Sequence, residues 1–223
     1  MTKTLFFRAI GKFLLGVAAL MLLLFLPAGS FRYWNGWLLL GILFVPMFAA
    51  GIVLMIRNPA LLEKRLSAKE KEAEQKAVIA LSGLMFLAAF VVAGLNYRFR
   101  WLEMPPWAVW TGTAVFLAAY LMYAEVLREN VWLSRTIEVQ EDQKVVDTGL
   151  YGIVRHPMYS ATLFLFLSMG IVLGSLFSFA ILLLYIPIIV LRIRNEEKVL
   201  EKELAGYQAY KSRVRYRLIP FVW

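Results

Sequence analysis

Cysteine is absent from the 223 residues, and histidine occurs once. Without cysteine the chain has no disulfide, no thiolate nucleophile and no thiolate metal ligand. A single histidine cannot complete a typical transition-metal site, so we expect no metal centre. Charged residues are also scarce, at 17% against about 25% in soluble domains. This composition excludes a disordered chain, a coiled coil and an ordinary soluble globule.

Apolar residues are abundant instead, at 61%, and the mean hydropathy is +0.68. They gather in uncharged runs at 13–31, 33–56, 77–97, 104–124 and 157–191. Each run can cross about 30 Å of hydrocarbon at roughly 1.5 Å per helical residue. The last run is 35 residues long and has a plausible break at 169–175, which predicts a helical hairpin. The sequence therefore predicts an all-α integral membrane protein with five or six transmembrane segments.

The formal net charge of +9 comes from 24 basic and 15 acidic residues. If the N-terminus is cytoplasmic, alternating loops place 21 basic residues on that side and leave only Arg32, Arg98 and Arg100 on the other. The positive-inside rule then puts both termini in the cytoplasm. Topology and anionic lipid headgroups account for the charge, so we expect membrane lipids and no nucleic acid as partners.

Polar residues concentrate in two segments that flank the hairpin, at 125–155 and 192–223. The segment 196–214 is predicted as an amphipathic helix, because Leu200, Leu204 and Tyr207 recur at helical spacing. The loop 57–76 is predicted as a short helix at the membrane surface. We divide the chain into N-terminal transmembrane helices, 1–125, and a core, 126–223, whose polar segments meet on the cytoplasmic side and hold any functional site.

His156 is followed by Pro157, which favours an extended histidine and suits the first position of a helix. The free backbone N–H groups of such a helix start favour a carboxylate or a phosphate. The alternative is an interfacial pair of Arg155 and His156 that faces lipid headgroups.

Arg192 and Glu196 are four residues apart, so on a helix they share a face where the hairpin leaves the membrane. The alternative is a simple intrahelical ion pair. Glu197 lies about 100° further around the helix, so we expect it to face away from a ligand and its substitution to weaken cofactor binding less than that of Glu196.

These residues belong to a larger ordered pattern. It consists of Gly149-x-Tyr151-x-x-x-Arg155-His156-Pro157-x-Tyr159, then Arg192-x-Arg194-x-Glu196-Glu197, then Tyr207-x-x-Tyr210 and a closing Arg217-Leu218-Ile219-Pro220. The pattern covers about the last 95 residues and resembles the isoprenylcysteine carboxyl methyltransferase family, whose wider relatives include phospholipid N-methyltransferases.

The resemblance implies a methyltransferase that holds S-adenosylmethionine (SAM) at the cytoplasmic end of the hairpin. Arg192 takes the place of the substrate-facing arginine, and His156 and Arg192 are the expected catalytic residues. The residues that the resemblance places against the cofactor are Gln140, Gln143, Lys144, Val145, Val146, Tyr151, His156, Pro157, Met158, Tyr159 and Glu196.

The expected substrate is a lipophilic small molecule or a lipid-modified acceptor, carrying either a carboxylate or an amine, that enters from the bilayer. Two alternatives stay open: an NADPH-dependent membrane reductase of the sterol-reductase type, and a non-catalytic membrane protein that keeps the fold. The absence of cysteine and the short loops favour a prokaryotic cell membrane.

Overall fold

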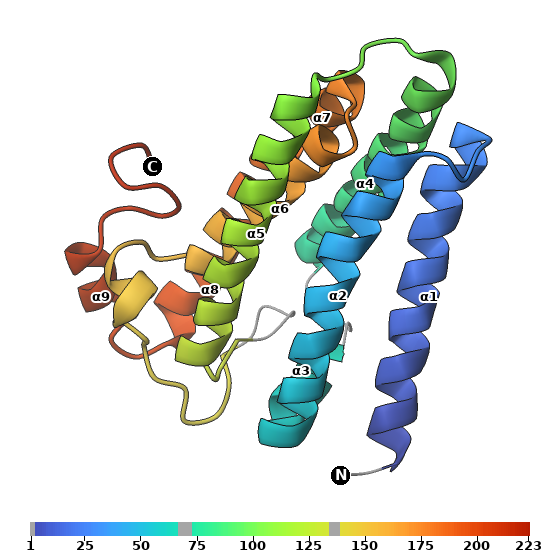
Figure 1. The fold of residues 1–223 in the computed structure, drawn as a ribbon. Coiled ribbons are helices and arrows are strands. Elements are labelled where there is room, and N and C mark those ends of the chain that lie inside the picture. The colour runs from blue at the N-terminus through green and yellow to red at the C-terminus, as the bar shows by residue number, and fades with distance from the viewer. Residues whose placement is uncertain (1–2, 67–72, 134–138) are drawn as a thin grey trace.

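A computed structural model describes residues 3–66, 73–133 and 139–223, and these ranges are predominantly helical (Figure 1). A 3₁₀ turn, η1, spans Gly149–Gly152. The α-helices are α1 (Lys3–Ala28), α2 (Trp34–Arg57), α3 (Pro59–Leu66), α4 (Ala73–Phe99), α5 (Pro106–Glu129), α6 (Pro157–Val172), α7 (Leu176–Leu182), α8 (Tyr185–Glu203) and α9 (Tyr207–Arg213).

Within the described ranges, five segments are long and apolar enough to cross a membrane: Leu5–Ala28, Trp34–Arg57, Lys76–Phe99, Pro106–Glu129 and Leu176–Glu203. The last combines α7 and α8, and α6 is a shorter apolar helix beside it. Large apolar side chains such as Leu15 and Leu26 on α1 and Leu121 on α5 are at least 70% exposed. Such exposure suits lipid rather than water, and the prediction of a multi-pass integral membrane protein is confirmed.

The short turns between α1 and α2, α4 and α5, and α6 and α7 gather at one end of the bundle (Figure 1). There the Tyr33 hydroxyl donates to the Leu173 carbonyl at 2.7 Å, and the Asn35 amide donates to the Val172 carbonyl at 2.8 Å. The Met104 N–H donates to the Gly174 carbonyl at 2.9 Å. These bonds tie the N-terminal helices to the turn of the C-terminal hairpin.

Two glycines let helix backbones approach closely. A Cβ added at Gly94 of α4 would lie 2.5 Å from the Leu24 carbonyl oxygen of α1. A Cβ at Gly112 of α5 would lie 2.7 Å from the Ile171 side chain of α6. Small residues at such crossings are a common basis for helix association in membranes, where van der Waals packing replaces the hydrophobic effect.

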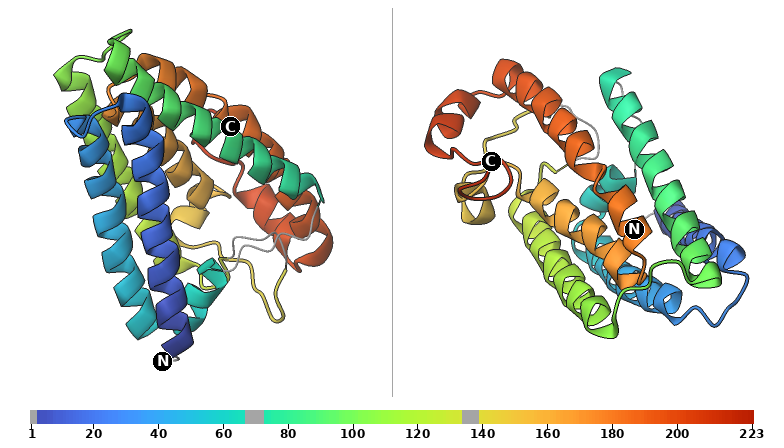
Figure 2. Two further views of the ribbon diagram at one scale, coloured as in Figure 1. Left: turned by 90° about the vertical axis from the view of Figure 1, so that its right-hand side faces the viewer. Right: turned by 90° about the horizontal axis from the view of Figure 1, so that it is seen from above.

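The predicted hairpin is confirmed. Helix α6 ends at Val172, and Gly174, with φ of +68°, lies in the turn before α7. The second arm is longer than expected, because α8 continues from the apolar run into the charged tail as far as Glu203. In both views of Figure 2 the C-terminal half of α8 and α9 lie apart from α1 and α2.

The prediction of one amphipathic helix over 196–214 is wrong. Helix α8 ends at Glu203, because Leu204 is extended, and Gly206 then adopts a left-handed conformation, with φ of +83°, before α9 begins. The apolar spacing was nevertheless meaningful, because Leu204 and Tyr207 pack together with Tyr210 and Val214 in a small buried cluster.

Part of the loop 57–76 forms the predicted short helix, α3, in which Leu61 and Leu62 are buried. The Lys12 ammonium of α1 donates to the Leu66 carbonyl at its end, at 2.6 Å. Residues 67–72 lie outside the described part of the chain.

Candidate active site

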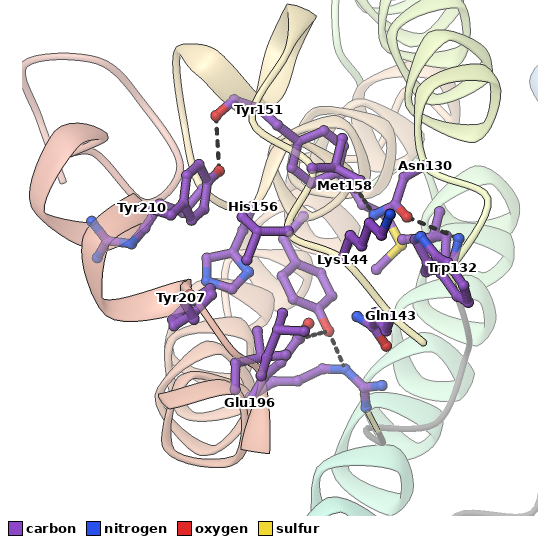
Figure 3. Close-up of a pocket in the computed structure, with 18 residues that line it drawn as sticks. Asn130, Trp132, Gln143, Lys144, Tyr151, His156, Met158, Glu196, Tyr207 and Tyr210 are labelled. Carbon is purple, nitrogen blue, oxygen red and sulfur yellow. Dashed lines mark hydrogen bonds between the residues drawn. The ribbon is translucent and has the colours of Figure 1, made fainter. Parts of the chain in front are cut away.

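A cavity of about 850 Å³, counting its open part, lies where the polar connection, the start of α6, α8 and α9 meet. Figure 3 shows Trp132, Gln143 and Lys144 on one side of it and His156, Glu196 and Tyr207 on the other. Ten of the residues predicted to form the site line it: Gln143, Lys144, Val145, Val146, Tyr151, His156, Met158, Tyr159, Arg192 and Glu196.

The start of α6 holds His156 at the cavity wall. His156 is the residue before the helix and Pro157 is the first helical residue, as their order in the sequence predicts. The N–H groups of Arg155 and His156 donate to the carbonyls of Tyr216 and Arg217, both at 2.9 Å. The C-terminal tail thus fixes the backbone around the histidine, whose side chain is 5% exposed.

Tyr159 joins the two charged residues of α8 that were predicted to share a face. Its hydroxyl donates to Glu196 Oε2 at 2.5 Å and accepts from Arg192 Nε at 2.9 Å. The guanidinium also lies 5.9 Å from the centre of the Tyr159 ring. Arg192 and Glu196 therefore line the cavity as hydrogen-bonded partners of Tyr159 and do not form an isolated surface ion pair.

Glu197 is the centre of a buried ionic cluster that sequence reasoning missed. Its Oε1 accepts from Arg155 Nε at 2.8 Å and lies 3.3 Å from His156 Nε2, while its Oε2 accepts from Arg217 Nε at 2.8 Å. Glu197 is 3% exposed and does not line the cavity. It faces away from the ligand space as predicted, and two buried or half-buried arginines depend on this carboxylate, so we expect its substitution to affect the fold rather than a bound ligand.

Arg155 extends this cluster to the tail. Its Nη1 donates to the carbonyls of Val214 and Arg215, at 2.7 and 2.9 Å. Arg155 is 6% exposed, so it is not a headgroup-facing partner of His156 in the way that the interfacial alternative required. It connects α6, α8 and the tail instead.

Two of the predicted residues lie beside the cavity rather than on its wall. Pro157 is buried as the first residue of α6. Gln140 shapes the turn that carries Gln143: its N–H donates to Gln143 Oε1 at 2.9 Å, and its side-chain amide donates to the Trp132 carbonyl at 2.6 Å. Both residues position cavity residues in this structure.

Tyr151 is held from both sides. The Asn130 side-chain amide donates to the Tyr151 hydroxyl, and the Tyr210 hydroxyl donates to the Tyr151 carbonyl, both at 2.8 Å. Asn130 follows α5 and Tyr210 belongs to α9, so the cavity wall depends on segments 80 residues apart. Asn130 and Tyr210 both line the cavity, and the sequence predicted neither as a site residue.

Tyr207 is a further cavity residue that sequence reasoning left without a role. It is 3% exposed, and within the described part of the chain its hydroxyl has no hydrogen-bond partner. Burial, followed by the charges of Glu197 and Glu196, raises the pKa of Tyr207 well above its ordinary value. The hydroxyl therefore stays protonated and can donate to a ligand. The Tyr207-x-x-Tyr210 spacing was the available signal, because on a helix it places both rings on one side.

Comparison with known proteins finds two similarities. Residues 107–206, from the start of α5 to just before α9, match the model of the phospholipid methyltransferase family, PEMT. The chain is also 32% identical over 91 residues to the Delta(14)-sterol reductase TM7SF2 of Mus musculus. That match covers 40% of this chain and 22% of the reductase, so the matched part is about a fifth of the relative's length. The membrane hairpin and most of the cavity wall thus lie in a region similar to the phospholipid methyltransferase family.

Proposed function

We propose that this protein is an integral-membrane methyltransferase that takes a methyl group from SAM and passes it to a lipophilic acceptor from the bilayer. The family match over 107–206 is the observation that carries the proposal. The cavity supports it, because it lies at the end of an apolar hairpin where a lipid and a soluble cofactor can meet. The isoprenylcysteine carboxyl methyltransferases are the branch that the sequence motifs favour.

The residues of the cavity suit the chemical groups of SAM. The Glu196 carboxylate can pair with an ammonium or with ribose hydroxyls. The Tyr207 hydroxyl, which has no partner among the residues that the structure describes, can donate to a carboxylate, and its burial makes such a bond favourable. Val145, Val146 and Met158 offer apolar surface for an aromatic base. All of the lining residues fall within 126–223, which we propose as the cofactor-binding core.

The bound cofactor supplies a methyl group on a sulfonium, which leaves the protein mainly to position the acceptor and exclude water. We assign acceptor positioning to Arg192, whose guanidinium is held by the Tyr159 hydroxyl at the edge of the apolar hairpin. A carboxylate acceptor needs no base. An amine acceptor must first lose a proton, and His156 is the base that the cavity offers.

The cofactor can be identified by calorimetry in detergent, which measures the binding of SAM, S-adenosylhomocysteine and NADPH to the protein. We expect both sulfur-containing ligands to bind and NADPH to remain unbound. Transfer of labelled methyl groups from SAM to lipid extracts, followed by mild alkaline hydrolysis, then separates the acceptor classes, because a methyl ester is cleaved and an N-methyl group is not. Absence of SAM binding in folded protein would overturn the proposal.

The match to a sterol reductase supports a second candidate, an NADPH-dependent membrane reductase. The reductase hypothesis requires that NADPH binds in the same titration and that SAM does not bind. If none of the three ligands binds, the third possibility, a non-catalytic protein that keeps the fold, is favoured.

A further inference from the structure

The segment 218–223, which we call the tail loop, has an exposed apolar tip. It follows Arg217 and contains no Asp, Glu, Lys or Arg. Phe221 is 88% exposed and Val222 is 76% exposed, more than any other large apolar side chain in the described residues. Phe221 also has φ of +65°, a left-handed conformation that aromatic residues rarely adopt.

The exposure of this tip does not result from a frayed end. The N–H groups of Arg217 and Leu218 donate to the Trp223 carbonyl at 2.9 and 3.0 Å, and the Trp223 N–H donates to the Ile219 carbonyl at 3.1 Å. Leu218, Ile219 and Trp223 pack against the main core. The loop is therefore closed and anchored on its inner side, and this closure holds the Phe221 and Val222 side chains outward.

The loop is attached to the membrane hairpin. The Ser160 hydroxyl, in the first turn of α6, donates to the Leu218 carbonyl at 2.6 Å. Because α6 is apolar and begins at Pro157, this bond places the loop where the hairpin enters the membrane. Basic residues precede the loop, and Arg213 and Arg215 are exposed. Apolar side chains beside exposed arginines suit acyl chains and anionic headgroups respectively.

We propose that the tail loop inserts Phe221 and Val222 into the cytoplasmic face of the lipid bilayer, beside the start of α6. The partner is the lipid surface itself, and the strained backbone at Phe221 is offset by burying the ring in acyl chains. The same tail pairs with the backbone of Arg155 and His156, so lipid contact supports the cavity wall. The insertion can be measured without any assay of methyl transfer, so its failure and the failure of the proposed function are distinguishable.

The absence of native cysteine makes a clean test possible. Phe221→Cys and Val222→Cys are each given a nitroxide label, and the intact protein is placed in nanodiscs that contain anionic phospholipid. Ser212→Cys is the matched control, because Ser212 is exposed nearby on α9. We expect the labels at 221 and 222 to collide more often with oxygen and several-fold less often with a water-soluble nickel chelate than the label at 212.

Nickel accessibility at 221 and 222 equal to that at 212 would overturn the insertion. Protection from both reagents together with dipolar broadening of the spectrum would also overturn it, since a second copy of the chain would then cover the tip. Size-exclusion profiles that match the unlabelled protein show that each variant is folded, and the use of two tip positions guards against a local defect at either one.

Discussion

Two adjacent carboxylates of α8, Glu196 and Glu197, face different surroundings. Glu196 faces the cavity and accepts from Tyr159, whereas Glu197 faces inward and holds Arg155 and Arg217. The difference follows from their offset of about 100° around the helix, which directs neighbouring side chains to different partners. One carboxylate is available to a ligand, and the other belongs to the interior of the fold.

The pair provides its own matched control. Glu196→Gln should weaken SAM binding by about 1.5–3 kcal/mol, the value of a hydrogen bond to a charged group, with little change in thermal stability. Glu197→Gln should lower the free energy of unfolding by about 3–5 kcal/mol, because it leaves buried guanidinium groups without a counter-charge. Calorimetry and thermal unfolding in detergent measure the two effects. Equal losses of affinity from both substitutions, in folded protein, would contradict this division.

Tyr207→Phe removes a buried hydroxyl that has no partner within the described residues. The ligand-free protein should therefore be as stable as the wild type or slightly more stable. SAM affinity should fall by about 1.5–3 kcal/mol, the value of a hydrogen bond to a charged group, because the proposed acceptor is a carboxylate. Tyr210→Phe is the control, because it breaks the bond to the Tyr151 carbonyl and should destabilise the protein without ligand. An unchanged affinity in Tyr207→Phe would remove this residue from the cofactor site.

Arg192→Lys keeps the positive charge but loses the planar guanidinium and its bond to Tyr159. If Arg192 positions the acceptor, turnover at saturating SAM should fall more than SAM affinity does. Steady-state kinetics and SAM titration of the same preparation give both numbers. The opposite outcome, a collapse of SAM binding with turnover preserved, would assign Arg192 to the cofactor.

At the scale of the elements, the features that could be predicted from the sequence are those that depend on local patterns, namely the membrane helices and the hairpin turn. The first four uncharged runs each became a membrane helix, the last became α6, α7 and the start of α8, and the predicted break at 169–175 contains the hairpin turn. The prediction of one tail helix was wrong because the apolar periodicity continues beyond Glu203, where an extended Leu204 ends α8. The pairing of Arg155 and His156 with the tail could not be predicted, because contacts about 60 residues apart leave no local signal.

Glycine packing between helices gives a prediction at the same scale. Gly94→Ala on α4 should lower stability by about 1–3 kcal/mol, because the new Cβ would meet the Leu24 carbonyl at 2.5 Å and push α1 away. Gly83→Ala on the same helix is the control: nothing lies within 4 Å of its Cβ position. It should be neutral or stabilising by up to about 1 kcal/mol through helix propensity. Thermal unfolding in detergent compares the two, and equal effects would contradict close packing of α1 on α4.

At the scale of the whole molecule, the distribution of basic residues predicts a cytoplasmic N-terminus and a cytoplasmic cavity. Arg32→Cys, in the α1–α2 turn, should react with a membrane-impermeant maleimide in intact cells. Arg194→Cys, which is exposed on α8, should react only after the membrane is opened. The reverse pattern would invert the topology, and with it the side from which a soluble cofactor enters.

The pairing of the tail with Arg155 and His156 also determines when the cavity can form during synthesis. The bonds from these N–H groups end on Tyr216 and Arg217, about 60 residues further along the chain. At roughly 5–20 residues per second, the ribosome needs about 3–12 s to add that length. The hairpin helices can therefore enter the membrane before the wall around His156 is complete, so that insertion and site assembly are separate events in the life of the nascent chain.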